Sequence, residues 1–251
     1  DQYEGRMFIE IKYNGEHLGM PYPVSGGWMA QFGPSYAYQD YTSKPSVMPI
    51  IWQIRANGTH RIFPWGDPEF AARSVRAAQF GDSSGYTVEP MTAYYPLTDY
   101  YTNQVNRDST WMRYLTGRDW FWYELWGRLG YDPGTPEQVW INMFNERFGK
   151  QAGEKVYRMM VAQSRIVPLV YSYRGAGPDH RSIAPELEFA RNIDHWIGYR
   201  AMEVTAYQTI DEFADNIVQG NLTGKLSPLD MVDTLREAAA EAARWREEAR
   251  R

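Results

Sequence analysis

Alternating apolar and polar positions mark the first regular element of the chain. In FIEIKY (residues 8–13), isoleucine and tyrosine alternate with Phe8, Glu10 and Lys12, as in a half-buried strand. Similar patterns predict strands over 48–56 and 84–91. Between the last two lies a helical pattern that begins at Pro68, since proline favours the first helical position. Strand, connecting helix and strand in this order predict parallel βα units.

The second part of the chain has a helical pattern throughout. From about residue 110, apolar residues recur every three or four positions. The predicted helices cover 119–130, 135–148, 153–173, 185–206, 210–219 and 227–250. Thr135 and Ser227 each precede a proline and are predicted N-caps. We therefore expect an α/β part over residues 1–110 and an α-helical domain over residues 111–251.

Composition excludes several classes of protein. The 251 residues are 43% hydrophobic and 23% charged, enough to bury a sizeable core. A net charge of -5 gives no electrostatic reason to bind nucleic acid or an anionic membrane, and no apolar run is long enough to span a bilayer. Without cysteine the chain has no disulfide, thiolate metal site or cysteine nucleophile.

Location is less constrained by the sequence. The chain begins at Asp1 and not at methionine, from which we expect a processed chain or a piece of a longer one. The lack of cysteine says little about the compartment, and a secreted or periplasmic bacterial protein is favoured only slightly over a cytoplasmic one.

Aromatic residues make up 16% of the chain, with 10 Trp and 19 Tyr. They are densest over residues 36–41, 92–101 and 119–126. One interpretation is a large aromatic core. The other is carbohydrate binding, because the apolar faces of sugar rings stack on flat aromatic side chains.

Polar residues gather where the predicted strands end. In parallel βα folds, ligands bind at the carboxyl ends of the strands, so these residues form a candidate site. They are Glu10, Lys12, Glu16 and His17 after the first strand, Gln53, Arg55, Asn57, His60, Arg61 and Trp65 after the second, and Glu89, Tyr94 and Tyr95 after the third. A network of structural ion pairs is the alternative explanation.

Two motifs resemble the α-glucuronidases, glycoside hydrolases that remove glucuronic acid from xylan. IEIKYNGEHLG (9–19) is similar to the strand and "QEYLG" segment late in the barrel of that family. Residues 111–140 are similar to its "ANLYAFGRLAWNP" helix entry, with Gly127-Arg128-Leu129 and Asp132-Pro133 in register. The resemblance implies the C-terminal portion of a (β/α)8 (TIM) barrel followed by a helical domain. It also implies a hydrolase for uronic-acid-containing glycans.

A complete barrel needs eight strands, and this sequence offers three. Three parallel strands alone leave two open edges, which stable proteins avoid. We therefore expect a further polypeptide, or a missing segment, to supply the earlier strands. In the resembling family the general acid lies on one of those strands.

The resemblance makes Glu16 the candidate base, with Glu10 and Glu89 as rivals, and His17 replaces an aromatic residue of the family motif. A uronate carboxylate needs a cation, for which Arg55, Lys12 and Arg61 are candidates. Trp65, Tyr94 and Tyr95 are the stacking candidates, and Gln53, Asn57 and His60 complete the polar set.

Two other functions stay open. A polysaccharide lyase would use His17 or a tyrosine as base, with Arg55 neutralising the uronate. A non-catalytic glycan-binding or scaffold protein would keep the aromatic platform without the acid. The four histidines lack paired-ligand spacing, so we expect no catalytic zinc. No phosphate-binding loop supports a nucleotide cofactor. A hard cation held by Asp67, Asp99 or Glu89 remains an option.

Overall fold

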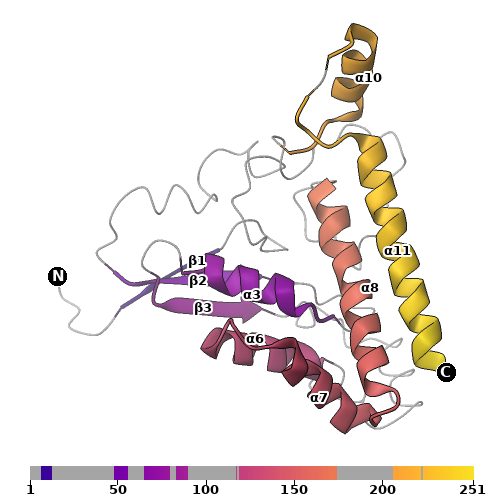
Figure 1. The fold of residues 1–251 in the computed structure, drawn as a ribbon. Coiled ribbons are helices and arrows are strands. Elements are labelled where there is room, and N and C mark those ends of the chain that lie inside the picture. Colours follow the sequence, from indigo (N-terminus) through magenta and orange to yellow (C-terminus); the bar gives the residue numbers. More distant parts are fainter. Residues whose placement is uncertain are drawn as a thin grey trace, which may run out of the picture.

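A computed structural model of the chain describes residues 7–12, 48–55, 65–79, 83–89, 117, 119–173, 206–221 and 223–251. The fold is mixed α/β and mostly helical (Figure 1). Its elements are β1 (Ile9–Lys12), β2 (Ile50–Arg55), α3 (Pro68–Ala77), β3 (Gly85–Glu89), α6 (Trp120–Tyr131), α7 (Glu137–Phe148), α8 (Gly153–Tyr173), α10 (Ile210–Gln219) and α11 (Pro228–Arg250). Each lies within, or within a residue of, a predicted segment, so these predictions are confirmed. The predicted helix over 185–206 falls outside the described residues except for its last position.

The three strands form one parallel sheet in the order β1-β2-β3. Ile9 pairs with Ile50, and Ile51 pairs with Gly85. The predicted parallel βα arrangement is therefore confirmed for β2, α3 and β3. That the sheet is part of a barrel stays a prediction.

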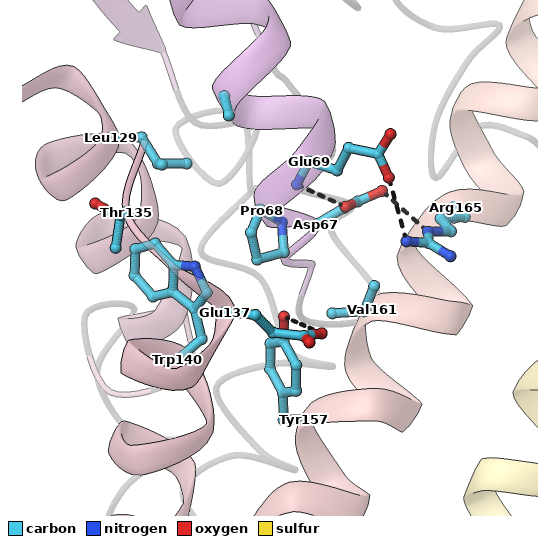
Figure 2. A pocket seen from close by; sticks show the side chains of 11 residues that line it. Asp67, Pro68, Glu69, Leu129, Thr135, Glu137, Trp140, Tyr157, Val161 and Arg165 are labelled. Atoms are coloured by element: carbon cyan, nitrogen blue, oxygen red, sulfur yellow. Dashed lines mark hydrogen bonds and ion pairs between the residues drawn. The ribbon is translucent and has the colours of Figure 1, made fainter. Parts of the chain in front are cut away.

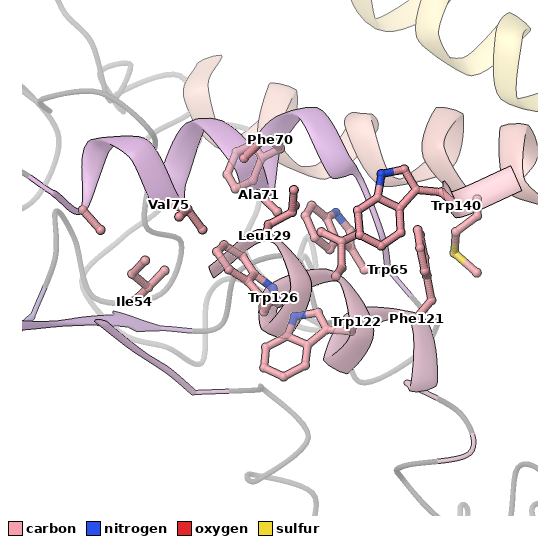
Figure 3. Close-up of a cluster of buried hydrophobic side chains, with 14 of the residues drawn as sticks. Ile54, Trp65, Phe70, Ala71, Val75, Phe121, Trp122, Trp126, Leu129 and Trp140 are labelled. Carbon is pink, nitrogen blue, oxygen red and sulfur yellow. The ribbon is translucent and has the colours of Figure 1, made fainter. Parts of the chain in front are cut away.

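The two faces of the sheet differ in character. Trp52 and Ile54 of β2 are fully buried and belong to the core that α3 and α6 share (Figure 3). The alternate residue Gln53 is only half-buried, and Glu10 and Thr87 on the neighbouring strands are exposed. Because side chains alternate along a strand, the helices cover one face and leave a polar face on the other.

Aromatic rings fill much of the core. Phe121 of α6 meets Phe144 of α7 edge to face, with ring centroids 4.8 Å apart. Trp122 and Trp126 are also buried. Most of the aromatic patch over 119–126 is thus core, although Tyr123 is exposed. The patches over 36–41 and 92–101 lie outside the described residues. This core includes residues from both sides of the predicted boundary at residue 110.

Of the two N-caps that the sequence predicts, Ser227 is confirmed and Thr135 is not, and α3 begins at Pro68 as predicted. Asp67 caps α3, with Pro68 as its first residue. Ser227 and Asp230 form a reciprocal capping box at α11. The prediction of Thr135 as the N-cap was wrong. The N-cap of α7 is Pro136, whose side chain has no hydrogen-bonding group. The Thr135 hydroxyl instead donates to the Asp132 carbonyl at 2.8 Å.

Trp65, expected to stack on a sugar, instead lies in the core and is only 1% exposed. Its indole N–H donates to the backbone carbonyl of Ser164 in α8 at 2.9 Å. That carbonyl is available because Pro168, four residues further along α8, has no N–H to donate to it. The indole therefore supplies the hydrogen bond that the proline removes.

The next residue strengthens this connection. The Gly66 N–H donates to the Ser164 hydroxyl at 2.9 Å, and that hydroxyl donates to the Met160 carbonyl at 2.6 Å. A Cβ at Gly66 would lie 2.2 Å from the Phe121 ring, so only glycine allows this close approach. Residues 65 and 66 thus tie the entry of α3 to the middle of α8.

None of the helices in the described residues is long and apolar enough to cross a membrane.

The paired roles of Trp65 and Pro168 predict a coupling between two substitutions. Trp65→Phe removes the donor to the Ser164 carbonyl and should lower the free energy of unfolding by about 1–3 kcal/mol beyond the loss of packing. In a Pro168→Ala background, the restored backbone N–H can donate to that carbonyl, so the same change should cost on the order of 1 kcal/mol less. Urea unfolding of the four proteins measures the difference.

Ser74→Ala provides the control, since Ser74 is buried on α3 and its hydroxyl has no hydrogen-bond partner among the described residues. Combined with Trp65→Phe it should give additive effects. Additivity between Trp65→Phe and Pro168→Ala would contradict the proposed exchange of donors.

Candidate functional site

Five of the residues predicted as a site lie at positions on the three described strands. Lys12, Gln53 and Thr87 occupy one row across the three strands, and Arg55 pairs with Glu89 in the register. Adjacent strands lie about 4.8 Å apart, so the register brings these positions together at the carboxyl ends of β1, β2 and β3. The Thr87 hydroxyl donates to Glu10 Oε1 at 2.6 Å, which links β1 to β3 across the polar face of β2.

The remaining predicted residues divide into two groups. Trp65 is in the core, as described above. The others lie outside the described residues: Glu16, His17, Asn57, His60, Arg61, Tyr94 and Tyr95, together with Asp99 of the suggested cation set. The structure thus places Glu10, Lys12, Gln53, Arg55 and Glu89 on adjoining strands and leaves the loop residues as predictions.

A cavity of about 220 Å³ opens at the start of α3, between α3, α7 and α8 (Figure 2). Its walls combine charged residues with the apolar side chains of Pro68, Leu129 and Val161. The charged members are Asp67, Glu69, Glu137 and Arg165. Only Asp67 belonged to a sequence-based prediction. Glu137 and Arg165 come from α7 and α8, and no local pattern reveals that these helices meet α3.

Asp67 is the buried charge of this cavity and is only 5% exposed. Its Oδ1 accepts from the backbone N–H groups of Glu69 and Phe70, which caps α3. Its Oδ2 lies 3.5 Å from Arg165 Nε, and Glu69 lies 3.5 Å from Arg165 Nη2. Burial raises the pKa of Asp67 above its usual 3.8, and this outweighs the lowering by Arg165 and by the two hydrogen bonds. Both oxygens therefore have structural partners already.

A second cluster lies on the α7 side of the cavity. The Tyr157 hydroxyl donates to Glu137 Oε1 at 3.3 Å, and Arg158 lies 3.7 Å from the same oxygen. Burial raises the pKa of Tyr157 above its usual range, so its hydroxyl keeps its proton and acts as a donor. Within the described part of the chain, no three His, Asp or Glu side chains are grouped as metal ligands.

The comparisons with known proteins rest on structure alone. No known protein family and no curated protein matches the sequence. Among solved structures, the chain is similar to a GH138 enzyme targeting pectin rhamnogalacturonan II, with a TM-score of 0.65 and 17% sequence identity. The match covers 96% of this chain and 28% of that one, so the chain spans less than a third of the length of this neighbour.

At 17% identity this similarity concerns the fold alone. It does not single out the α-glucuronidases, which the sequence motifs resemble.

The raised pKa of Asp67 predicts a pH dependence of stability. Above pH 3.8 the carboxyl ionises in the unfolded chain but holds its proton longer in the folded one. The folded state then binds more protons, so the Asp67 contribution to the free energy of unfolding falls as pH rises through this window. Asp67→Asn keeps a capping oxygen and does not titrate. The variant should therefore gain stability relative to the unaltered protein as pH rises from 3.8.

Denaturant unfolding at a series of pH values gives this difference directly. Asp132→Asn, at an exposed position after α6, controls for the change in net charge. The free energy of unfolding of Asp67→Asn, taken relative to the unaltered protein, could instead stay constant or fall as pH rises. That result would show that Arg165 dominates the electrostatics of the buried carboxyl.

Proposed function

We propose that this chain is part of a glycoside hydrolase that acts on a uronic-acid-containing polysaccharide or oligosaccharide. The observation that carries the proposal is the register of the sheet, which gathers positions of both charge signs at the carboxyl ends of three parallel strands. Ligands of parallel βα folds bind at that edge.

The structural neighbour supports the reaction class. The neighbour is an enzyme that targets a pectin, and the shared fold extends over nearly all of this chain. Because the match covers 28% of the neighbour, we also propose that further βα units, from another polypeptide or another segment, complete a barrel around these strands.

The proposed roles follow the chemistry of glycoside hydrolysis, which needs a carboxylic acid and a carboxylate. Glu16 is the proposed base, Glu10 and Glu89 are its rivals, and the acid comes from an earlier strand. Arg55 and Lys12 supply the positive charge for the uronate carboxylate, for which the planar fork of arginine is well suited. Gln53, in the row between Lys12 and Thr87, contributes a hydrogen bond to the sugar.

Uronate recognition is tested by Arg55→Ala. Loss of a charge-assisted pair costs roughly 1.5–3 kcal/mol, so affinity for glucuronic acid should fall about tenfold to hundredfold, with little change for glucose. Titration calorimetry or ligand-observed NMR on the full chain measures both sugars.

Arg73→Ala is the matched control, because Arg73 is exposed on α3, which lies behind the other face of the sheet. Equal binding of glucuronic acid and glucose by the unaltered protein would contradict the proposed preference for uronic acids.

Catalysis is tested separately by Glu16→Gln, which keeps the shape of the side chain and removes the proton acceptor. General-base catalysis contributes about 10²–10⁴-fold, so turnover of a uronic acid glycoside should fall by that factor while KM changes little. Turnover within a few-fold of normal would move the role to Glu89 or Glu10. An unsaturated, ultraviolet-absorbing product would instead identify a lyase.

A further inference from the structure

Helix α10 is strongly specified by its sequence, yet it buries no residue. Thr209 and Glu212 form a complete capping box, and Gly220 ends the helix in the left-handed conformation with a φ of 69°. A ten-residue helix is too short to be stable alone in water, so most of its stability must come from packing. Figure 1 shows α10 beyond the first turns of α11, away from the sheet and from α6 and α7.

The base of α10 is nevertheless held firmly. The Gln208 N–H donates to the Leu226 carbonyl at 2.9 Å, and the Leu226 N–H donates to the Ala206 carbonyl at 2.8 Å. Lys225 pairs with Glu212 at 3.2 Å. The helix is therefore presented in a defined position by the segment that connects it to α11.

One face of α10 is apolar. Ile210, Phe213 and Ile217 recur at spacings of three and four and so share a face, with Val218 beside it. Ile217 is 64% exposed and Val218 is 86% exposed. Nearby, at the same end of the molecule, Leu226, Leu229 and Val232 are also exposed. This concentration of exposed aliphatic side chains is typical of a protein interaction site. We call the face formed by Ile210, Phe213, Ile217 and Val218 the α10 apolar face.

Acidic residues run along one edge of this face. Asp211 and Asp215 are four residues apart and lie on the side of Val218. Neither forms an ion pair with another described residue, and α10 itself carries no basic side chain. The edge of the α10 apolar face is therefore negatively charged.

We propose that the α10 apolar face is a docking surface for an amphipathic protein helix whose apolar side is bordered by Lys or Arg. The aliphatic face provides the buried centre of such an interface, and the Asp211 and Asp215 edge selects a basic border on the partner. This inference is independent of the glycan chemistry proposed for the strand ends, which lie in a different part of the fold.

The same charges argue against two other occupants. In an antiparallel pair of two copies, the acidic edge of each α10 would face the same edge of its partner, which costs energy. An anionic membrane surface would be repelled by this edge for the same reason. A helix with a basic border avoids both penalties.

Two designed helical peptides test the proposal, with identical leucine faces and either lysine or glutamate on the other positions. Fluorescence anisotropy with the full chain should show binding of the lysine peptide, at least about tenfold weaker binding of the glutamate peptide, and weakening by salt. Ile217→Asp, at an exposed position that tolerates the change in folding, should reduce affinity for the lysine peptide by about tenfold or more. Asp211→Asn with Asp215→Asn should narrow the difference between the peptides.

Two controls make the result specific to α10. Tyr131→Asp changes a 94% exposed hydrophobic residue at the end of α6 and should leave peptide affinity unchanged. Glu124→Gln with Glu146→Gln removes two exposed charges from α6 and α7 and should preserve the preference for lysine.

Several outcomes would overturn the proposal. Equal affinity for both peptides would remove the charge argument, and insensitivity to Ile217→Asp would place binding elsewhere. Absence of measurable binding to the lysine peptide would exclude this class of partner. A dimer in sedimentation experiments that Ile217→Asp dissociates would identify a second copy of the chain as the occupant instead.

Discussion

The hydrogen bond from the Trp65 indole to the Ser164 carbonyl is the contact on which the join between sheet and helices depends. Pro168 leaves that carbonyl without its helical donor, and the indole N–H takes the place of that donor. A proline in a helix interior ordinarily costs stability. In α8 the cost is offset because a distant side chain takes the place of the missing N–H, and the adjacent Gly66 N–H binds the Ser164 hydroxyl. The entry of α3 is thereby fixed against α8, and with it the buried Asp67 that caps α3.

The two faces of the sheet differ in the side chains that they carry. The face that carries Trp52 and Ile54 packs into the core of buried aromatic and aliphatic side chains around Phe121. The opposite face carries Glu10, Gln53 and Thr87 and has few apolar side chains among the described residues. A packed layer behind a polar layer is the arrangement that holds polar side chains in fixed positions for a ligand.

The sequence predicted local structure well, since local structure depends on neighbouring residues. The Ser227 N-cap and the start of α3 at Pro68 each depend on a few consecutive residues, and both predictions are correct. The prediction of Thr135 as the N-cap of α7 was wrong by one residue. Pro136 is extended, with a ψ of 150°, and the helix starts after it. The prediction for Trp65 failed for a different reason: its partner is 99 positions away, and no periodicity connects residue 65 to residue 164.

The candidate site was also predicted only where it depends on local sequence. Periodicity placed Lys12, Gln53 and Arg55 near strand ends, and the parallel register brings those positions together. The cavity at α3 could not be predicted, because Arg165 and Glu137 reach it from helices separated along the chain. The aromatic content was ambiguous in sequence, and most of the patch in α6 became core because its rings recur at helical spacing.

The parallel sheet also has a consequence for the order in which the molecule assembles. Ile9 and Ile50 are about forty residues apart, so β1 and β2 cannot close as a hairpin and must wait for a long connection. By contrast, α7 and α8 are joined by a short turn and can pair early as a local helical hairpin. The topology therefore favours helices first and strands last, with the Trp65 bond closing near the end. A chain caught before that step still exposes its strand edges, which makes the sheet the part most prone to mispairing during synthesis.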